Sequence, residues 1–210
     1  MIYTFGGMKY SLGKTRSAVN FALFLSRVKG RDVLLIDGDP SECASEYIQW
    51  RNNQNSSDRL ATVKVNGKSL KSEVLKLKDK FDDIVIDSGV GEHLEYSMHI
   101  TDRLIVPFNG KDLGLWTVWT LTNIETLINK SLDLNPNLKA YSFFIKKPNV
   151  EQEDKQIVKT LKQSQFLTYL ESSQVHQMMT GEEKNAMRSL RDFKHYKNDE
   201  LKDLFEDESR

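Results

Sequence analysis

The residues best suited to chemistry lie near the start of the chain, in the segment Gly6–Thr15 (GGMKYSLGKT). The apolar run Ile2–Phe5 precedes this segment and a helical pattern follows it, so Gly13-Lys14-Thr15 falls at an expected strand-to-helix junction. The first amides of a helix lack backbone partners and lie at the positive end of its dipole, which favours anions there. A lysine at that point can reach phosphate oxygens, and a threonine hydroxyl can ligate Mg²⁺. The segment predicts a phosphate-binding loop; the alternative is an ordinary helix start with an exposed lysine and a capping threonine.

Two later apolar runs end in aspartate. Val33–Ile36 is followed by Asp37 and Asp39, and Ile84–Ile86 is followed by Asp87. Ligands of open parallel sheets bind outside the carboxyl ends of the strands, so we expect these side chains at the same edge as the loop. A carboxylate there can hold Mg²⁺ or orient an attacking water. Aspartate also favours ordinary turns, which is the alternative reading for each residue taken alone.

The elements that would position these residues alternate between short apolar runs and longer helical patterns. This alternation predicts an α/β fold with a doubly wound, mostly parallel sheet flanked by helices. We interpret Asn52–Asp58 as a polar loop. Trp116 and Trp119 share one face of a predicted helix, and we interpret them as core residues, with a partner surface as the alternative. The expected strands are 2–5, 33–36, 84–86, 104–106, 140–145 and 166–170, and the expected helices are 14–28, 69–80, 113–128 and 151–161.

Length and composition set further bounds. The chain has 210 residues with 30 Lys plus Arg and 30 Asp plus Glu, so net charge gives no general attraction to nucleic acid or membrane. We expect a single domain over residues 1–210, with a charged helical C-terminal segment from about residue 182. Cys43 is the only cysteine, which fits a reducing, cytoplasmic setting. We find no apolar run long enough to span a bilayer and no signal-peptide pattern at the start.

Two segments resemble the ParA/MinD family of deviant Walker-A ATPases, in particular the small plasmid-partition ATPases. Lys9–Asn20 (KYSLGKTRSAVN) is similar to the family loop K-G-G-x-G-K-T-T, and Val33–Pro40 (VLLIDGDP) is similar to its hydrophobic-D-x-D-P motif. The resemblance extends more weakly through Asp87, through residues 102–112 and through residues 172–181.

The resemblance implies roles for individual residues. Lys9 matches the signature lysine that crosses a dimer interface to the partner's nucleotide, and Lys14 matches the phosphate-binding lysine. Asp39 matches the acidic residue that positions the attacking water. The implied metal-site residues are Thr15, Asp37 and Asp87, and the implied nucleotide-binding residues are Lys9, Tyr10, Ser11, Leu12, Gly13, Lys14, Thr15 and Arg16.

The resemblance also implies an activity and partners. Proteins of this family bind ATP or ADP with Mg²⁺, form a homodimer around ATP and bind DNA without sequence preference, and a ParB-like adaptor protein stimulates hydrolysis. A slow ATPase that acts in DNA partition or positioning, associated with the nucleoid and not with a membrane, is therefore expected. Three differences bear on the hydrolysis rate and dimer geometry rather than on nucleotide binding: Tyr10-Ser11 replaces Gly-Gly, Arg16 replaces the second threonine, and Ser41 replaces a frequent glutamine.

Near the end of the chain, basic residues recur at helical spacing. From Lys184 to Lys197 there are five basic residues and one acid, so a helix there would carry a one-sided basic stripe. A DNA-backbone contact is one interpretation, and a solvated helix face is the other. The stripe residues are Lys184, Arg188, Arg191 and Lys194.

Two other classes of function stay open. The chain could be a ParA-like accessory protein, in plasmid maintenance or conjugation, that binds nucleotide without useful turnover. It could also be a metabolic P-loop enzyme, such as a small-molecule kinase or a ligase related to dethiobiotin synthesis. Lys9 favours the partition ATPase and the accessory protein, because an ordinary kinase loop has no reason to carry it.

Overall fold

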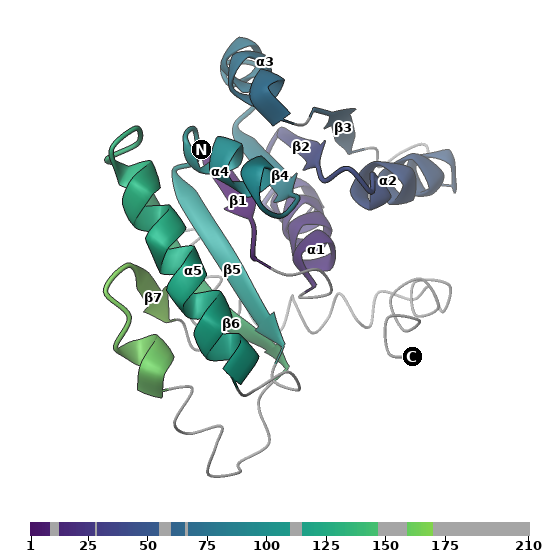
Figure 1. Cartoon of the computed structure of the whole chain (residues 1–210). Coiled ribbons are helices and arrows are strands. Elements are labelled where there is room, and N and C mark those ends of the chain that lie inside the picture. The colour runs from purple at the N-terminus through teal and green to yellow at the C-terminus, as the bar shows by residue number, and fades with distance from the viewer. Residues whose placement is uncertain are drawn as a thin grey trace. The chain divides into compact units, whose positions relative to one another are not determined.

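The computed structural model describes residues 1–8, 13–27, 29–54, 60–65, 67–109, 115–146 and 159–169. Figure 1 labels the helices and strands, and a 3₁₀ turn (Gly67–Ser69) leads into α3. The helices are α1 (Lys14–Arg27), α2 (Cys43–Gln54), α3 (Leu70–Leu77), α4 (Glu92–Met98) and α5 (Leu115–Leu132). The strands are β1 (Ile2–Phe5), β2 (Val33–Gly38), β3 (Ala61–Lys64), β4 (Asp83–Ser88), β5 (Arg103–Asn109), β6 (Lys139–Lys146) and β7 (Leu167–Tyr169).

The strands form one seven-stranded sheet in the order β3-β2-β4-β1-β5-β6-β7, and each described pair of neighbours is parallel. The predicted doubly wound parallel sheet is therefore confirmed. The chain first moves from β1 through β2 to β3 and then returns across the sheet to β7. Because parallel crossovers are right-handed, this reversal places α1 and α2 on one face and α3, α4 and α5 on the other. The reversal also makes β1 a central strand at a topological switch point.

Helix α1 covers the middle of one face through aromatic contacts. The ring of Phe21 lies 4.9 Å from that of Tyr3 and 5.6 Å from that of Phe5, measured between centroids. Ala18 and Ala22 lie on the same buried side of the helix, and their small side chains allow a close approach to the sheet. This packing fixes the direction in which α1 leaves the carboxyl end of β1.

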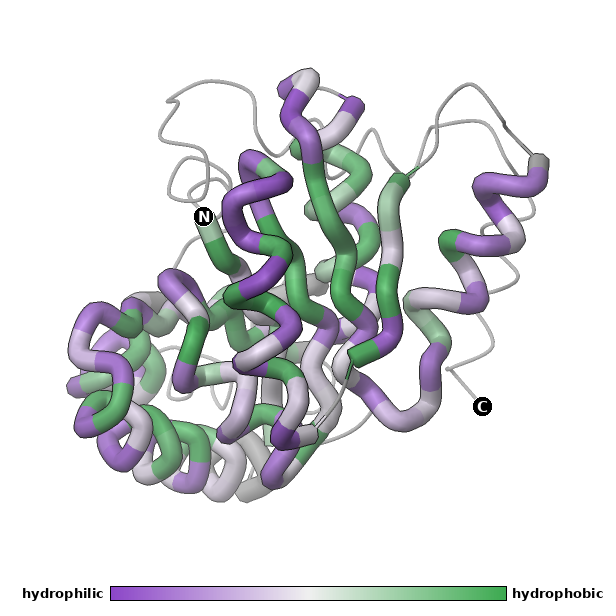
Figure 2. Tube along the Cα trace, turned by 90° about the horizontal axis from the view of Figure 1, so that it is seen from above, coloured by the Kyte–Doolittle hydropathy of each residue, from purple (hydrophilic) through white to green (hydrophobic). Residues whose placement is uncertain are grey.

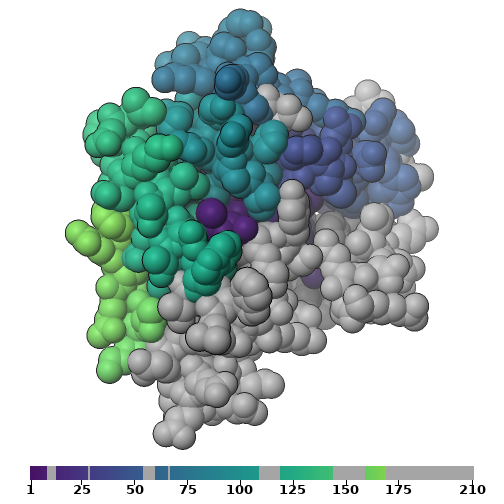
Figure 3. All heavy atoms as spheres, viewed as in Figure 1, coloured from purple at the N-terminus to yellow at the C-terminus, as the bar shows by residue number. Residues whose placement is uncertain are grey.

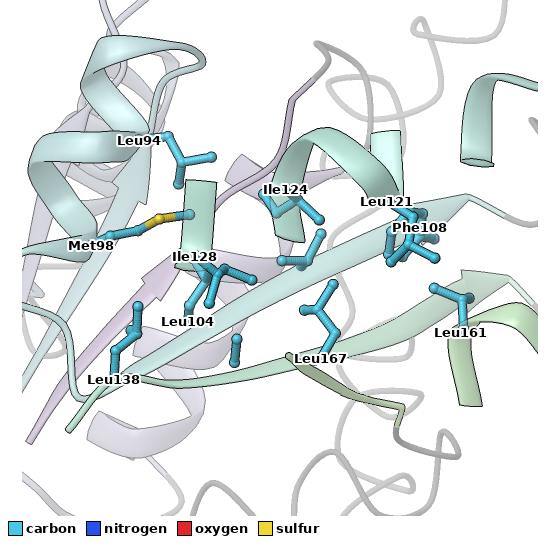
Figure 4. Close-up of a cluster of buried hydrophobic side chains, with 12 residues drawn as sticks. Leu94, Met98, Leu104, Phe108, Leu121, Ile124, Ile128, Leu138, Leu161 and Leu167 are labelled. Atoms are coloured by element: carbon cyan, nitrogen blue, oxygen red, sulfur yellow. The ribbon is translucent and has the colours of Figure 1, made fainter. Parts of the chain in front are cut away.

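The other face carries two apolar clusters. One lies under α3 and includes Leu70 and Val74 from the helix with Ile84 and Ile86 from β4. The second lies between α4, α5 and β5, and Figure 4 shows Leu94 among its side chains. The view in Figure 3 shows dark purple atoms of the N-terminal part of the chain in a small area between the teal and green parts.

Hydropathy follows this layering. Figure 2 shows green, hydrophobic stretches along the strands, whereas the helices alternate between green and purple. Strands β2 and β4 are buried at all six positions, which explains why their sequences are continuous apolar runs rather than alternating ones. Of the described helices, none has the length and apolar character needed to cross a bilayer.

The structure corrects two interpretations and adds three elements. Asn52 is not in a loop, because α2 continues to Gln54, and its side-chain amide pairs with the backbone of Leu60 at 3.0 and 3.1 Å. Trp119 is not a core residue, because it is 49% exposed, outside the buried side of α5 that includes Leu121. The side chain of Trp116 lies outside the described residues. The elements α2, β3 and α4 were not predicted.

Candidate functional site

The first strand and the first helix meet at the edge of the sheet where the phosphate-binding loop was predicted. Gly13 has a positive φ of 70°, which a residue with a Cβ adopts only with strain. Its carbonyl accepts a hydrogen bond of 3.0 Å from the Ser17 amide, so the first turn of α1 begins here. Lys14 is the first helical residue and is only 5% exposed. The structure therefore confirms the strand–turn–helix context of Gly13-Lys14-Thr15.

Asp37 and Asp87 lie side by side at the carboxyl ends of β2 and β4, where they are register partners. Asp87 also pairs in register with Phe5 at the end of β1. Side chains alternate between the faces of a sheet, so both aspartates share the face of Phe5, which is the face that α1 covers. The N-terminus of α1 and the two carboxyl groups consequently meet at one edge.

Asp87 is the most unusual group of the site. It is 0% exposed, and neither carboxylate oxygen receives a hydrogen bond of normal geometry from the described residues. The pKa of Asp87 is raised to about 7, chiefly because the carboxyl group is buried; a hydrogen bond from the Thr15 hydroxyl and the charge of Lys14 oppose this shift, and the charge of Asp37 adds to it. A buried carboxyl beside a threonine hydroxyl and a lysine has the donor chemistry to bind Mg²⁺ or its coordinated water. These residues fit the predicted metal site.

Asp37, by contrast, already has partners. Its Oδ2 accepts a hydrogen bond of 2.7 Å from the Ser45 amide in the first turn of α2, and its Oδ1 accepts one of 3.3 Å from the Asp39 amide. Burial raises the pKa of Asp37, and these hydrogen bonds oppose that shift. Asp37 thus holds the N-terminus of α2 against the sheet. The carboxylate oxygens of Asp37 keep further lone pairs, so Asp37 can still have the predicted role near the metal.

Asp39 lies in a tight loop between β2 and α2. Its carboxylate accepts a hydrogen bond of 2.9 Å from the Ser41 amide, and its carbonyl accepts one of 3.0 Å from the Glu42 amide. The next residue, Pro40, packs against the loop after β4: a Cβ added to Gly89 would lie 3.1 Å from Pro40 Cδ. The loops carrying Asp39 and following Asp87 are therefore in contact.

The described residues include only part of the predicted site. Gly13, Lys14, Thr15, Asp37 and Asp87 come together at this edge, with Asp39 in the adjoining loop. The described residues contain no group of three or more histidine, cysteine or carboxylate side chains of the kind that hold a metal alone. Lys9, Tyr10, Ser11 and Leu12 lie outside the described residues, as do the stripe residues Lys184, Arg188, Arg191 and Lys194.

Sequence reasoning missed two neighbours of the site. Glu42 precedes α2 with a positive φ of 58° and forms an ion pair of 2.5 Å with Lys64 at the end of β3. His93 follows the loop after Asp87, and its Nδ1 is buried without a hydrogen bond from the described residues. Neither residue belongs to a recognisable short motif. The only signal in the sequence that could have indicated these two residues is the polar character of the segments around them.

Comparison with known proteins supports the fold. No protein-family model and no curated protein sequence matches the chain. Among solved structures, a plasmid partition protein from Borrelia burgdorferi B31 bound to AMPPNP matches with a TM-score of 0.63 and 18% identity, over 92% of this chain and 96% of that one.

Two other solved structures have the same fold but are bound to different ligands. Cobyrinic acid a,c-diamide synthase from Mycobacterium smegmatis, with bound ADP and magnesium, matches with a TM-score of 0.61 and 17% identity, over 77% of this chain and 80% of that one. The pNOB8 ParA protein bound to nonspecific DNA matches with a TM-score of 0.53 and 14% identity, over 98% of this chain and 94% of that one. The chain therefore shares the fold of ParA/MinD-type partition proteins, as the resemblance in its loop and aspartate motifs implies.

Proposed function

We propose that this protein is an ATP-dependent partition or positioning ATPase, a switch that dimerises around Mg²⁺-ATP and binds DNA while the nucleotide is present. The observation that carries the proposal is the fully buried carboxyl group of Asp87 beside Thr15 and Lys14 at the N-terminus of α1, whose oxygens receive no hydrogen bond of normal geometry from the described residues. A folded chain retains such an unsatisfied group at a free-energy cost, which is expected where a ligand completes the site.

Each residue has a role that follows from its position. The amides at the start of α1 and the Lys14 ammonium would bind the phosphates. The Thr15 hydroxyl and the Asp87 carboxylate would hold Mg²⁺, which would neutralise negative charge on the phosphates. Asp39 would orient the water that attacks the γ-phosphate. Lys9 would reach the nucleotide of the second subunit in the dimer.

DNA binding would use the basic stripe. Each subunit offers four cations there, so a dimer doubles the phosphate contacts and makes binding steeply dependent on salt. The proposal is supported by the fold shared with a ParA protein that binds nonspecific DNA. In this scheme the protein acts in the cytoplasm at the nucleoid, and a ParB-like adaptor stimulates slow hydrolysis and releases the DNA.

The first test compares ATP binding and phosphate release in the wild type, Lys14→Ala and Asp39→Ala. Lys14→Ala should lose binding, because a phosphate charge is left uncompensated. Asp39→Ala should bind ATP and lose turnover. Lys80→Ala is the matched control, because Lys80 is exposed beyond the end of α3, and it should leave both properties unchanged. Binding that survives in Lys14→Ala would contradict the proposed site.

The second test concerns DNA. Arg188→Glu combined with Arg191→Glu should abolish ATP-dependent binding to duplex DNA. Lys68→Glu combined with Lys80→Glu makes the same change in net charge elsewhere and should retain it. Unchanged DNA binding in the arginine variant would reject the role of the stripe.

The solved neighbours favour a second candidate, a metabolic enzyme, because the same fold carries a diamide synthase with bound ADP and magnesium. This candidate predicts a specific small-molecule acceptor and no DNA affinity. A nucleotide-binding accessory protein instead predicts ATP binding without phosphate release under any tested condition. Turnover that DNA and an adaptor stimulate would separate the partition ATPase from both.

A further inference from the structure

Two adjoining hollows lie at the amino ends of the strands, at the opposite edge of the sheet from Asp87. The first has a volume of about 450 Å³ and lies between α3, the start of β1 and the end of α4. The second has a volume of about 810 Å³ and lies at the starts of β5 and β6. Met1 and Asp102 line both hollows. The two hollows therefore adjoin each other at these residues, and we call them together the amino-edge trough.

The wall of the trough at α3 is apolar with cations on either side. Leu75 lines the first hollow and is 48% exposed, and Phe81 and Ile100 contribute further apolar surface. Lys71 and Lys78 line the same hollow, four residues before and three residues after Leu75, so the three side chains share one face of the helix. An exposed leucine between two lysines forms an apolar surface that is flanked by positive charge.

The charged side chains that line the trough are mostly basic. Lys71 and Lys78 line the first hollow and Arg103 and Lys139 line the second, whereas Asp102 is the one carboxylate among the described lining residues. Asp102 is already engaged, because its Oδ2 accepts a hydrogen bond of 2.7 Å from the Ile2 amide.

The two lysines of α3 are available for an incoming anion. Within the part of the chain that the structure describes, neither Lys71 nor Lys78 forms an ion pair. Lys76, on another face of the same helix, is by contrast paired with Glu73 at 2.7 Å. The uncompensated charge of α3 is therefore concentrated at the trough.

We propose that the amino-edge trough is a docking site for an acidic segment of a partner protein that carries a bulky apolar side chain. The apolar side chain would pack on Leu75, and the acidic groups would pair with the lysines. An elongated ligand fits better than a compact metabolite, because the trough spans two hollows with cations at both ends. A DNA backbone fits poorly, because it offers no apolar group to cover Leu75. The proposal does not rest on nucleotide binding.

The test is fluorescence anisotropy with a short fluorescein-labelled peptide of glutamate and aspartate residues around two leucines. The wild type should bind it, and Lys71→Glu with Lys78→Glu should weaken binding at least about tenfold, since attractive pairs become repulsive. Lys68→Glu with Lys80→Glu makes the same change in net charge at exposed positions outside the trough and should leave affinity within about twofold. Leu75→Ala should weaken binding about threefold through lost apolar contact.

Other outcomes would overturn the proposal. These are no binding by the wild type, equal weakening by both lysine pairs, or equal affinity for a peptide with alanine in place of the leucines. A duplex DNA fragment that competes through the same two lysines would also overturn it. ATP binding, measured in parallel, should be unchanged in all the trough variants, so that failure of the docking site is distinguished from failure of the proposed function. Thermal unfolding of each variant checks that the fold is retained.

Discussion

At the scale of single residues, the site is distinguished by a fully buried carboxyl group, that of Asp87, which receives no hydrogen bond of normal geometry from the described part of the chain. Asp87 and Asp37 are neighbours at the ends of adjacent strands, yet only Asp37 is satisfied by backbone amides. An aspartate after an apolar strand could be predicted from sequence. The difference between the two aspartates could not be predicted, because it depends on the amides of Asp39 and of Ser45 in α2, and α2 was not predicted.

The raised pKa of Asp87 predicts a pH-dependent effect of Asp87→Asn in the nucleotide-free protein. A carboxyl whose pKa rises to about 7 on folding binds protons more tightly when folded, so stability falls as pH rises from about 4 to about 7. Asparagine removes that penalty, and the variant should be more stable than the wild type by up to about 4 kcal/mol at about pH 8. The difference should shrink as the pH is lowered, as measured by urea unfolding in EDTA.

The same substitution should weaken binding of Mg²⁺-nucleotide, because the neutral amide is a poor ligand for Mg²⁺. Asp37 stays in both proteins, so the comparison isolates Asp87. Equal pH dependence of stability in the wild type and Asp87→Asn would contradict the assigned ionisation.

Glu42 gives a second prediction at this scale. Its φ of 58° is strained for any residue with a Cβ, and glycine relieves the strain. Glu42→Gly should be more stable than Glu42→Ala by about 1 kcal/mol in chemical denaturation. Both variants lose the exposed ion pair with Lys64, so the difference between their stabilities reports only the strain of the backbone at position 42. Lys64→Ala should have little effect, and a more stable Glu42→Ala would show that φ is not the controlling factor.

At the scale of elements, the contact between β1 and α4 fixes the end of the central strand. A Cβ added at Gly6 would lie 2.2 Å from Leu94 Cδ1, and Leu94 is fully buried. Gly6→Ala should therefore destabilise the protein by about 1–3 kcal/mol, because the core must shift to accept the methyl group.

A double-mutant cycle measured by urea unfolding tests that contact. Leu94→Ala removes the clashing atoms and should cost about 2–5 kcal/mol alone through the cavity it leaves. Combined with Gly6→Ala, the two changes should cost less than their sum, because the new methyl group occupies part of that cavity. Strict additivity would mean that the two residues do not meet.

Two of the three elements that the sequence analysis missed, β3 and α4, are short. Strands β2 and β4 and helix α1 are covered nearly throughout, and their sequences carry strong apolar patterns. Strand β3 is a four-residue edge strand with no fully buried position, and α4 has only seven residues. Such short elements are stabilised by tertiary contacts rather than by their own patterns.

At the scale of the whole molecule, the two edges of the sheet have different chemistry. The carboxyl edge gathers buried carboxyl groups and the start of α1, whereas the amino edge carries the apolar, cationic trough. The carboxyl-edge site could be predicted because parallel strands end together. The trough could not, because it joins residues from α3, β1, β5 and β6 that are distant in sequence.

The most direct test of the central claim is a crystal structure of the protein grown with Mg²⁺ and a non-hydrolysable ATP analogue. We expect the phosphates at the amides of residues 13–16, with Mg²⁺ at about 2.1 Å from the Thr15 hydroxyl and bound to Asp87 directly or through one water. A nucleotide bound elsewhere, or Asp87 still buried and unpartnered with the analogue present, would contradict the account.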